Sequence, residues 1–145
     1  MNARGRPGSP DQGETLIEVI MAVAIMGIAV VAIVGGIATT ILMSDVHRKQ
    51  ATSGAYVRNY AEAVETYVAA GHFDASASPN YLPATVGFAA PTGFTAAPPL
   101  VQCWNDTTKV FRTCAAGNTV QQVTLSISSA DSRASESAAV VVRKP

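Results

Sequence analysis

The sequence predicts an α+β fold, in which one long N-terminal helix packs on a small antiparallel β-sheet. Three observations support this prediction. Residues 19–43 form an apolar run without a formal charge, residues 44–70 carry apolar side chains at helical spacing, and residues 101–145 contain segments in which apolar and polar side chains alternate. Repeats near 3.6 residues are typical of helices, and alternation with period 2 is typical of strands. The chain of 145 residues is therefore expected to place one small head domain behind a membrane segment.

The apolar run from Val19 to Met43 predicts a membrane-spanning helix. At about 1.5 Å per residue the run is longer than the hydrocarbon core of a bilayer, which is about 30 Å thick. A cleaved secretory signal has a shorter apolar core of about 7–15 residues and a small-residue cleavage site, and the sequence after this run, TTILMSDVHRKQ, contains no such site. Basic residues stand on both sides of the run, so their distribution does not fix its orientation: Arg4, Arg6, Arg48 and Lys49.

A glutamate, Glu18, stands at the entrance of this run, in the stretch GETLIEVIMAVAIMGI of residues 13–28. A carboxylate deep in hydrocarbon costs about 2.5–3.5 kcal/mol on insertion scales, so we expect a compensating partner. The stretch resembles the N-terminal signal of type IV prepilins and type II secretion pseudopilins. The resemblance covers Gly13, the residues from Thr15 to Glu18, and the Ile/Val/Ala tract to Gly27. It implies that a prepilin peptidase cuts on the cytoplasmic side after Gly13 and leaves the helix in the mature protein.

The resemblance also implies roles for Glu14 and Glu18. Glu14 becomes the first mature residue, and its new α-amino group has a reference pKa of about 7.7–8.0. In the family's filaments the buried carboxylate, here Glu18, meets the amine of a neighbouring subunit and sets the axial register. The family usually has Phe where this chain has Glu14, so N-methylation of the terminus stays open and the Glu14 carboxylate competes for the amine. The alternative for Glu18 is that its side chain simply reaches the headgroup region.

The domain organisation follows from these segments. Residues 1–13 are the expected leader peptide, 14–43 the transmembrane and assembly helix, 44–70 its amphipathic continuation, 71–100 a Pro-rich loop, and 101–145 a small antiparallel sheet, an order that is also pilin-like. Three glycines interrupt the apolar helix: Gly27, Gly35 and Gly36. They predict either close helix packing through small residues or flexibility when the helix leaves the bilayer for a filament.

The amphipathic segment and the loop after it have distinct patterns. One helical face is expected to carry the apolar residues of this segment, and Gly71 is the expected helix stop; the residues of that face are Val57, Tyr60, Ala61, Val64 and Tyr67 or Val68. Five prolines between residues 71 and 100 exclude a long helix or a central strand. Aromatic side chains are expected either to attach this loop to the head or to face a neighbouring subunit: Phe73, Tyr81, Phe88 and Phe94.

Three to four strands are expected after the loop. VQCWNDTTKVFRTC predicts a hairpin with a tight turn around residues 105–108, which places Cys103 opposite Val110. VQQVTLSIS alternates in the manner of a half-buried strand, and AAVVVRKP follows the polar turn SADSRASES as a closing strand. If the head is exported, Cys103 and Cys114 form a disulfide that is not a ladder pair; if it is cytosolic, both are free thiols. Trp104 is expected to cover the sheet edge or to pack under the loop.

The residue patterns do not predict an enzyme, a cofactor or a metal site. His47 and His72 have no Cys, Asp or Glu at metal-ligand spacing, and the few basic residues form no cluster of the kind that nucleic acid requires. We therefore expect a structural subunit of a type IV pilus or a type II secretion-like filament, in the bacterial plasma membrane with its N-terminus cytoplasmic and its head outside. Its expected partners are a prepilin peptidase, other pilin or pseudopilin subunits, and membrane lipid. The alternative is an uncleaved, single-pass anchor that carries an extracytoplasmic binding module.

Overall fold

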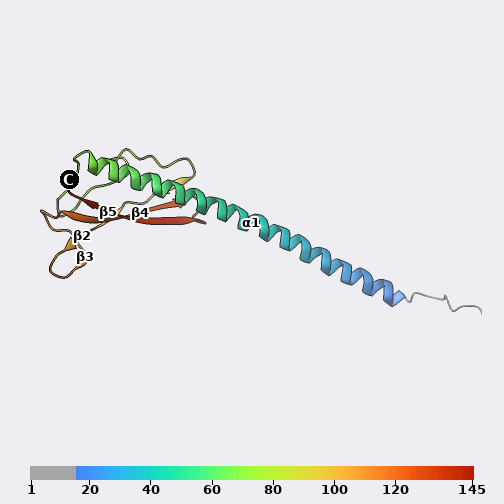
Figure 1. Ribbon diagram of the computed structural model, residues 1–145. Helices are drawn as coiled ribbons and strands as arrows, with labels where there is room; N and C mark the ends of the chain where they lie inside the picture. The colour runs from blue at the N-terminus through green and yellow to red at the C-terminus, as the bar shows by residue number, and fades with distance from the viewer. Residues whose placement is uncertain (1–15) are drawn as a thin grey trace, which may run out of the picture. The chain divides into compact units, whose positions relative to one another are not determined.

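A single long helix and a five-stranded sheet make up the structure, a computed structural model that describes residues 16–145 (Figure 1). The helix α1 runs from Leu16 to Ala69. It ends as the sequence predicts, because Gly71 adopts a φ of 91° and its N–H donates to the Val68 carbonyl, while the His72 N–H donates to the Tyr67 carbonyl. This pair of bonds is the Schellman motif, and its left-handed position is the one that glycine fills without strain.

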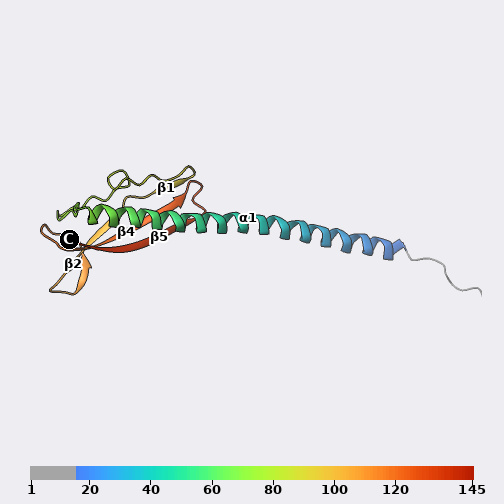
Figure 2. The same cartoon turned by 45° about the horizontal axis from the view of Figure 1, so that its top comes forward.

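The chain divides into two units, Met1–Leu42 and Met43–Pro145, and each is described by itself. The second unit contains the head, in which all strand pairs are antiparallel and β4 is central (Figure 2). One edge of β4 pairs with β5, and the other pairs with β2 and then β1, while β3 pairs with β2. The α+β prediction is confirmed. The strands are β1 (Phe94–Ala96), β2 (Leu100–Asn105), β3 (Val110–Arg112), β4 (Val120–Ser129) and β5 (Ser135–Arg143).

The strand number and one loop boundary differ from the sequence-based prediction. The expected loop of residues 71–100 contains β1, which pairs Phe94 with Ser129 and brings the sheet to five strands. β1 is compatible with the nearby prolines because it is three residues long and lies at the edge of the sheet, where a missing N–H is tolerated. β5 also begins earlier than expected, at Ser135 inside the polar segment that was predicted as a turn.

The hairpin register was predicted wrongly by two residues. Cys103 lies opposite Arg112 and Asn105 opposite Val110, so the connecting loop has four residues where a tight two-residue turn was expected. The Asn105 side-chain oxygen accepts the N–H groups of Thr107 and Thr108, and the loop closes with Lys109 at a φ of 54°. Asparagine side chains stabilise this kind of turn. The longer loop shifts every residue pair between β2 and β3.

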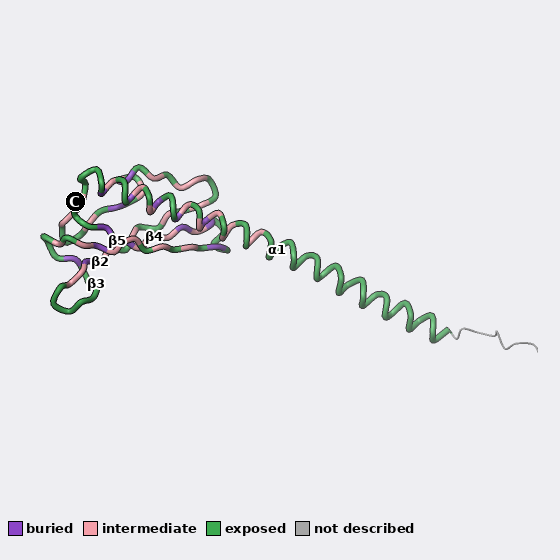
Figure 3. Tube along the Cα trace, viewed as in Figure 1, coloured by how far each residue is buried: buried purple, intermediate pink, exposed green. Residues whose placement is uncertain are grey.

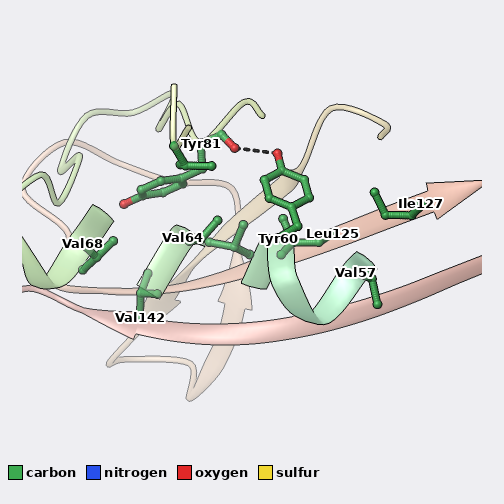
Figure 4. Packing of buried hydrophobic residues seen from close by; sticks show 10 residues of the cluster. Val57, Tyr60, Val64, Val68, Tyr81, Leu125, Ile127 and Val142 are labelled. Carbon is green, nitrogen blue, oxygen red and sulfur yellow. Dashed lines mark hydrogen bonds between the residues drawn. The ribbon is translucent and has the colours of Figure 1, made fainter. Parts of the chain in front are cut away.

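The core lies between the second half of α1 and one face of the sheet (Figures 3 and 4). Val57, Tyr60, Val64 and Val68 are buried on the helix, as the helical spacing predicts. They face the buried side of the two longest strands, where every second residue of β4 is buried. The strand residues in this cluster are Val123, Leu125, Ile127 and Val142.

The loop of residues 71–93 is attached to the core through Tyr81, whose side chain is fully buried. The Tyr60 hydroxyl donates to the Tyr81 carbonyl at 2.7 Å (Figure 4), and the Tyr81 hydroxyl donates to Gln121 Oε1 at 2.7 Å. The Gln121 amide in turn donates to the Asp74 carbonyl at 2.6 Å. Burial raises the pKa of Tyr60 to about 12, so both tyrosines stay protonated and able to donate at neutral pH.

The predicted aromatic attachment of the loop is confirmed. Phe73, Phe88 and Phe94 are half-buried against the same core, and Phe88 stacks on Tyr60 with ring centroids 4.7 Å apart. Phe94 meets Tyr56 edge to face at 5.3 Å. The buried amide of Gln121 was not predicted, because its place in an alternating strand does not reveal the polar partners that the loop supplies.

Candidate functional site

The first half of α1 presents apolar side chains to solvent on all sides (Figure 3). Its large side chains are mostly more than half exposed, and no residue between Leu16 and Leu42 is buried. A helix that is apolar all round must be covered by lipid or by other apolar helices. One helix of the described residues, α1, is long and apolar enough to span a membrane. The membrane-spanning length predicted from the sequence is therefore present in the structure.

The polar groups of this apolar segment are satisfied within the helix. The Thr39 hydroxyl donates to the Gly35 carbonyl at 3.0 Å, and the Thr40 hydroxyl donates to the Gly36 carbonyl at 2.9 Å. A hydroxyl bonded to the carbonyl four residues earlier needs no water, so both threonines are compatible with hydrocarbon.

Glu18 is the remaining polar side chain of the segment, and it lies exposed in the first turn of α1. A carboxylate at this end is favoured by the positive end of the helix dipole, by about 0.3–1 kcal/mol. Among residues 16–145 it forms no ion pair, so it is available to a partner outside the chain. The two residues of the predicted cleavage site, Gly13 and Glu14, lie outside the described residues.

The three glycines of the apolar segment lie in uninterrupted helix. Apart from the adjacent residues and the local helix backbone, no atom lies within 4 Å of the position that a Cβ would take at Gly27, Gly35 or Gly36, so the chain's own packing does not require glycine there. A shallow apolar groove runs along Gly27, and it is lined also by Ala24, Ile28, Val31 and Ala32. Small residues on an open helix face let a second helix approach closely, which favours the packing interpretation of these glycines.

Cys103 and Cys114 form a disulfide in the head, with Cα atoms 4.8 Å apart. Because Cys103 pairs with Arg112 in the ladder, the disulfide joins β2 to the segment that follows β3 and is not a ladder pair, as predicted. Both sulfurs belong to buried residues. Disulfides persist in oxidising compartments and are rare in the reducing cytosol.

Reduction of this disulfide is expected to lower the free energy of unfolding of the head by about 3 kcal/mol, because an 11-residue separation restricts the unfolded chain by about that amount in the chain-entropy model. Urea unfolding of the full chain in detergent micelles, with and without dithiothreitol and followed by Trp104 fluorescence, measures the change. The double variant Cys103→Ser/Cys114→Ser should match the reduced protein and should not respond to dithiothreitol. Equal stability of the oxidised and reduced protein would contradict the prediction.

An ion cluster connects α1 to the turn between β4 and β5. Lys49 Nζ lies 2.7 Å from an Asp45 oxygen and 2.6 Å from an Asp131 oxygen, and the Ser129 hydroxyl donates to the second Asp131 oxygen. The hydrogen bonds from Lys49 and then Ser129 lower the pKa of Asp131, and the bond to Asp131 raises the pKa of Lys49. The sequence did not reveal this contact, since Lys49 and Asp131 are 82 residues apart.

Acidification should release this cluster. The pKa of Asp131 is lower in the folded protein than the reference value of about 3.9, so its contribution to stability is complete above that value and is lost as the pH falls through the folded pKa. We therefore expect the melting temperature of the wild type to fall more between about pH 5 and pH 2 than that of Asp131→Asn, which lacks the contribution at every pH. Glu65→Gln, on the exposed side of α1, should behave as the wild type. Parallel melting curves for wild type and Asp131→Asn across this pH range would disprove a stabilising role for the cluster.

These features define the chain as a protein with one helix long and apolar enough to cross a membrane, followed by a disulfide-bonded α+β head. Comparison with protein-family models, curated proteins and solved structures gives no match for this chain.

Proposed function

We propose that this protein is a structural subunit, a pilin or pseudopilin, of a type IV pilus or a type II secretion-like filament. A prepilin peptidase processes it after Gly13, and the N-terminal helix then carries it from the membrane into the filament. The observation that carries the proposal is the first half of α1, which is exposed and apolar on every side and has one carboxylate, Glu18, in its first turn. In this function, lipid covers the apolar surface before assembly, and the helices of neighbouring subunits cover it in the filament.

The proposed roles of Glu18 and the glycines follow from their surroundings. Glu18 has no ion-pair partner in the described part of the chain, and the amine that cleavage creates on Glu14 of a neighbouring subunit would neutralise it. The open groove at Gly27 and the bare backbone at Gly35 and Gly36 offer close approach to neighbouring helices.

The proposed location is the bacterial plasma membrane, with the N-terminus in the cytoplasm and the head outside. The disulfide between Cys103 and Cys114 supports this orientation, because a reducing cytoplasm does not maintain such bonds. The partners are a prepilin peptidase, membrane lipid and further pilin or pseudopilin subunits.

Coexpression with a prepilin peptidase tests the processing step. Mass spectrometry of the purified chain should find a mature protein that begins at Glu14, because the peptidase cuts after the glycine at the membrane entrance. Gly13→Leu should block the cut, whereas the matched leader variant Gly8→Leu should not. An intact Met1 in the wild type would instead identify an uncleaved, membrane-anchored extracytoplasmic module, and a cut after Met43 would likewise contradict processing at Gly13.

A further inference from the structure

The face of the sheet opposite α1 carries a group of side chains that the proposed function does not use. In β2, β4 and β5 successive side chains alternate between the buried face and the outer face of the sheet. On the buried face, Cys103, Gln121 and Val142 lie side by side on the three strands. One residue further along, Val120 pairs with Arg143, and Trp104 of β2 lines the same groove as both, so we treat these three as one row on the outer face. The next row consists of Gln102, Gln122 and Val141. We call these six residues the outer platform.

The outer platform has a concave end. Trp104, Val120 and Arg143 line a groove of about 450 Å³ together with Asp106 and Lys144, a volume within the range of about 300–1,000 Å³ that is usual for small-ligand sites. The Trp104 indole is held in position, because its Nε1–H donates to Asp106 at 3.0 Å and its ring meets Phe111 edge to face at 5.3 Å. An aromatic side chain that is fixed before binding loses little conformational entropy when a ligand packs on it.

The remaining polar groups of the outer platform, together with the neighbouring Lys144 of the groove, are free to bind. Within residues 16–145, the side chains of Gln102 and Gln122 make no hydrogen bond and those of Arg143 and Lys144 form no ion pair, while Val141 is 58% exposed. A carboxylate oxygen and two cations thus line the groove of the Trp104 indole, and two planar amides lie in the next row of the outer platform. Amides and carboxylates bind hydroxyl groups, a guanidinium binds a carboxylate with two parallel hydrogen bonds, and the face of an indole attracts polarised C–H groups.

We propose that the outer platform binds an acidic polysaccharide whose sugar units carry carboxylates. The C–H face of one sugar ring packs on Trp104, its hydroxyls bind the amides of Gln102 and Gln122, and a carboxylate of the chain pairs with Arg143 and Lys144. Asp106 accepts a further sugar hydroxyl through the oxygen that does not bind the Trp104 indole. This site lies in the head, and the proposal does not depend on the proposed role of α1 in filaments.

The same surface is less suited to nucleic acid. A phosphodiester backbone presents acceptors only, so the Asp106 carboxylate and the two amide carbonyls would find no donor there. Arg143 and Lys144 are also the only basic residues of the groove, fewer than the cluster that phosphate-dominated binding uses. Hydroxyl-rich sugar units satisfy both the donors and the acceptors of the platform.

Fluorescence of Trp104 provides the test, because it is the single tryptophan of the chain. The full-length protein in detergent micelles is titrated with oligogalacturonate, with a neutral maltooligosaccharide of equal length, and with oligothymidylate. We expect a saturable change of emission with oligogalacturonate that persists at about 0.15 M salt, where charges more than about 8 Å apart are largely screened. Maltooligosaccharide should bind more weakly by about tenfold, since it cannot pair with Arg143.

Variants separate the platform from general electrostatics. Arg143→Gln should weaken oligogalacturonate binding by about tenfold or more, as truncation of an arginine anchor usually does. Arg58→Gln removes the same charge from the exposed side of α1 and should leave the affinity unchanged. The proposal is overturned if oligogalacturonate gives no saturable change, if maltooligosaccharide binds as tightly, or if both variants weaken binding equally. Tighter binding of oligothymidylate with the same dependence on Arg143 would assign the platform to nucleic acid instead.

Discussion

Replacement of Glu18 by Gln is expected to leave cleavage after Gly13 intact and to abolish incorporation of the chain into filaments. Glutamine keeps the size and hydrogen-bonding capacity of the side chain but removes its charge. The α-amino group of a neighbouring subunit would then enter an apolar bundle without a counter-charge, and breaking one member of a buried ion pair typically costs about 3–5 kcal/mol. Repeated at every subunit, this loss should prevent assembly.

Two measurements on the same cells test this prediction. Mass spectrometry follows the appearance of the terminus at Glu14, and immunoblotting compares the protein in sheared filaments with the protein in membranes. Glu62→Gln is the matched control, because Glu62 is exposed on the second half of α1 and loses the same charge. Normal filaments from Glu18→Gln would refute the assembly role and favour the alternative that Glu18 only reaches the headgroup region.

Replacement of Tyr81 by Ala is expected to lower the free energy of unfolding of the head by about 3–5 kcal/mol, the usual cost of removing a buried aromatic side chain. Tyr81 is fully buried, and its hydroxyl also binds the side chain of Gln121. The head is small, and typical domains are stable by only about 5–15 kcal/mol, so this variant should lie close to the limit of folding.

Tyr81→Phe isolates the hydroxyl from the ring. It leaves Gln121 Oε1 and the Asp74 N–H without their partner, so the free energy of unfolding of the head should fall by about 1–3 kcal/mol. Tyr67→Phe is the control, because Tyr67 is half-buried and its hydroxyl makes no hydrogen bond within the described residues. Urea unfolding of the full chain in micelles, followed by Trp104 fluorescence, measures all three variants. A Tyr81→Phe protein as stable as Tyr67→Phe would show that the buried polar network does not stabilise the head.

The assembly segment and the outer platform belong to different units of the chain, so their tests are independent. Glu18→Gln should bind oligogalacturonate as the wild type does, because all six residues of the outer platform lie between residues 102 and 143 in the head. Arg143→Gln should be cleaved and assembled normally. The two sets of variants therefore distinguish a filament subunit that also binds polysaccharide from a subunit with either function alone.

The sequence alone predicts the parts of this fold that depend on local pattern. The helix and its buried face at Val57, Tyr60, Val64 and Val68 follow from a repeat near 3.6 residues, the stop at Gly71 follows from the φ that glycine allows, and the buried side of β4 follows from strict alternation. Each of these signals depends on residues that are only a few positions apart in the sequence. The apolar segment and Glu18 within it are likewise apparent without coordinates.

What only the tertiary structure decided is how distant polar groups pair and how long each turn is. Lys49 meets Asp131, Tyr81 meets Gln121, and Trp104 shares a row with Arg143, and these partners are brought together only when α1, the loop and the strands pack. The pairing of Cys103 with Arg112 depended on a loop two residues longer than a tight turn. Hydrophobic burial is visible in the sequence because apolar residues recur with the period of the helix or strand. A hydrogen bond or an ion pair between remote residues produces no such repeat.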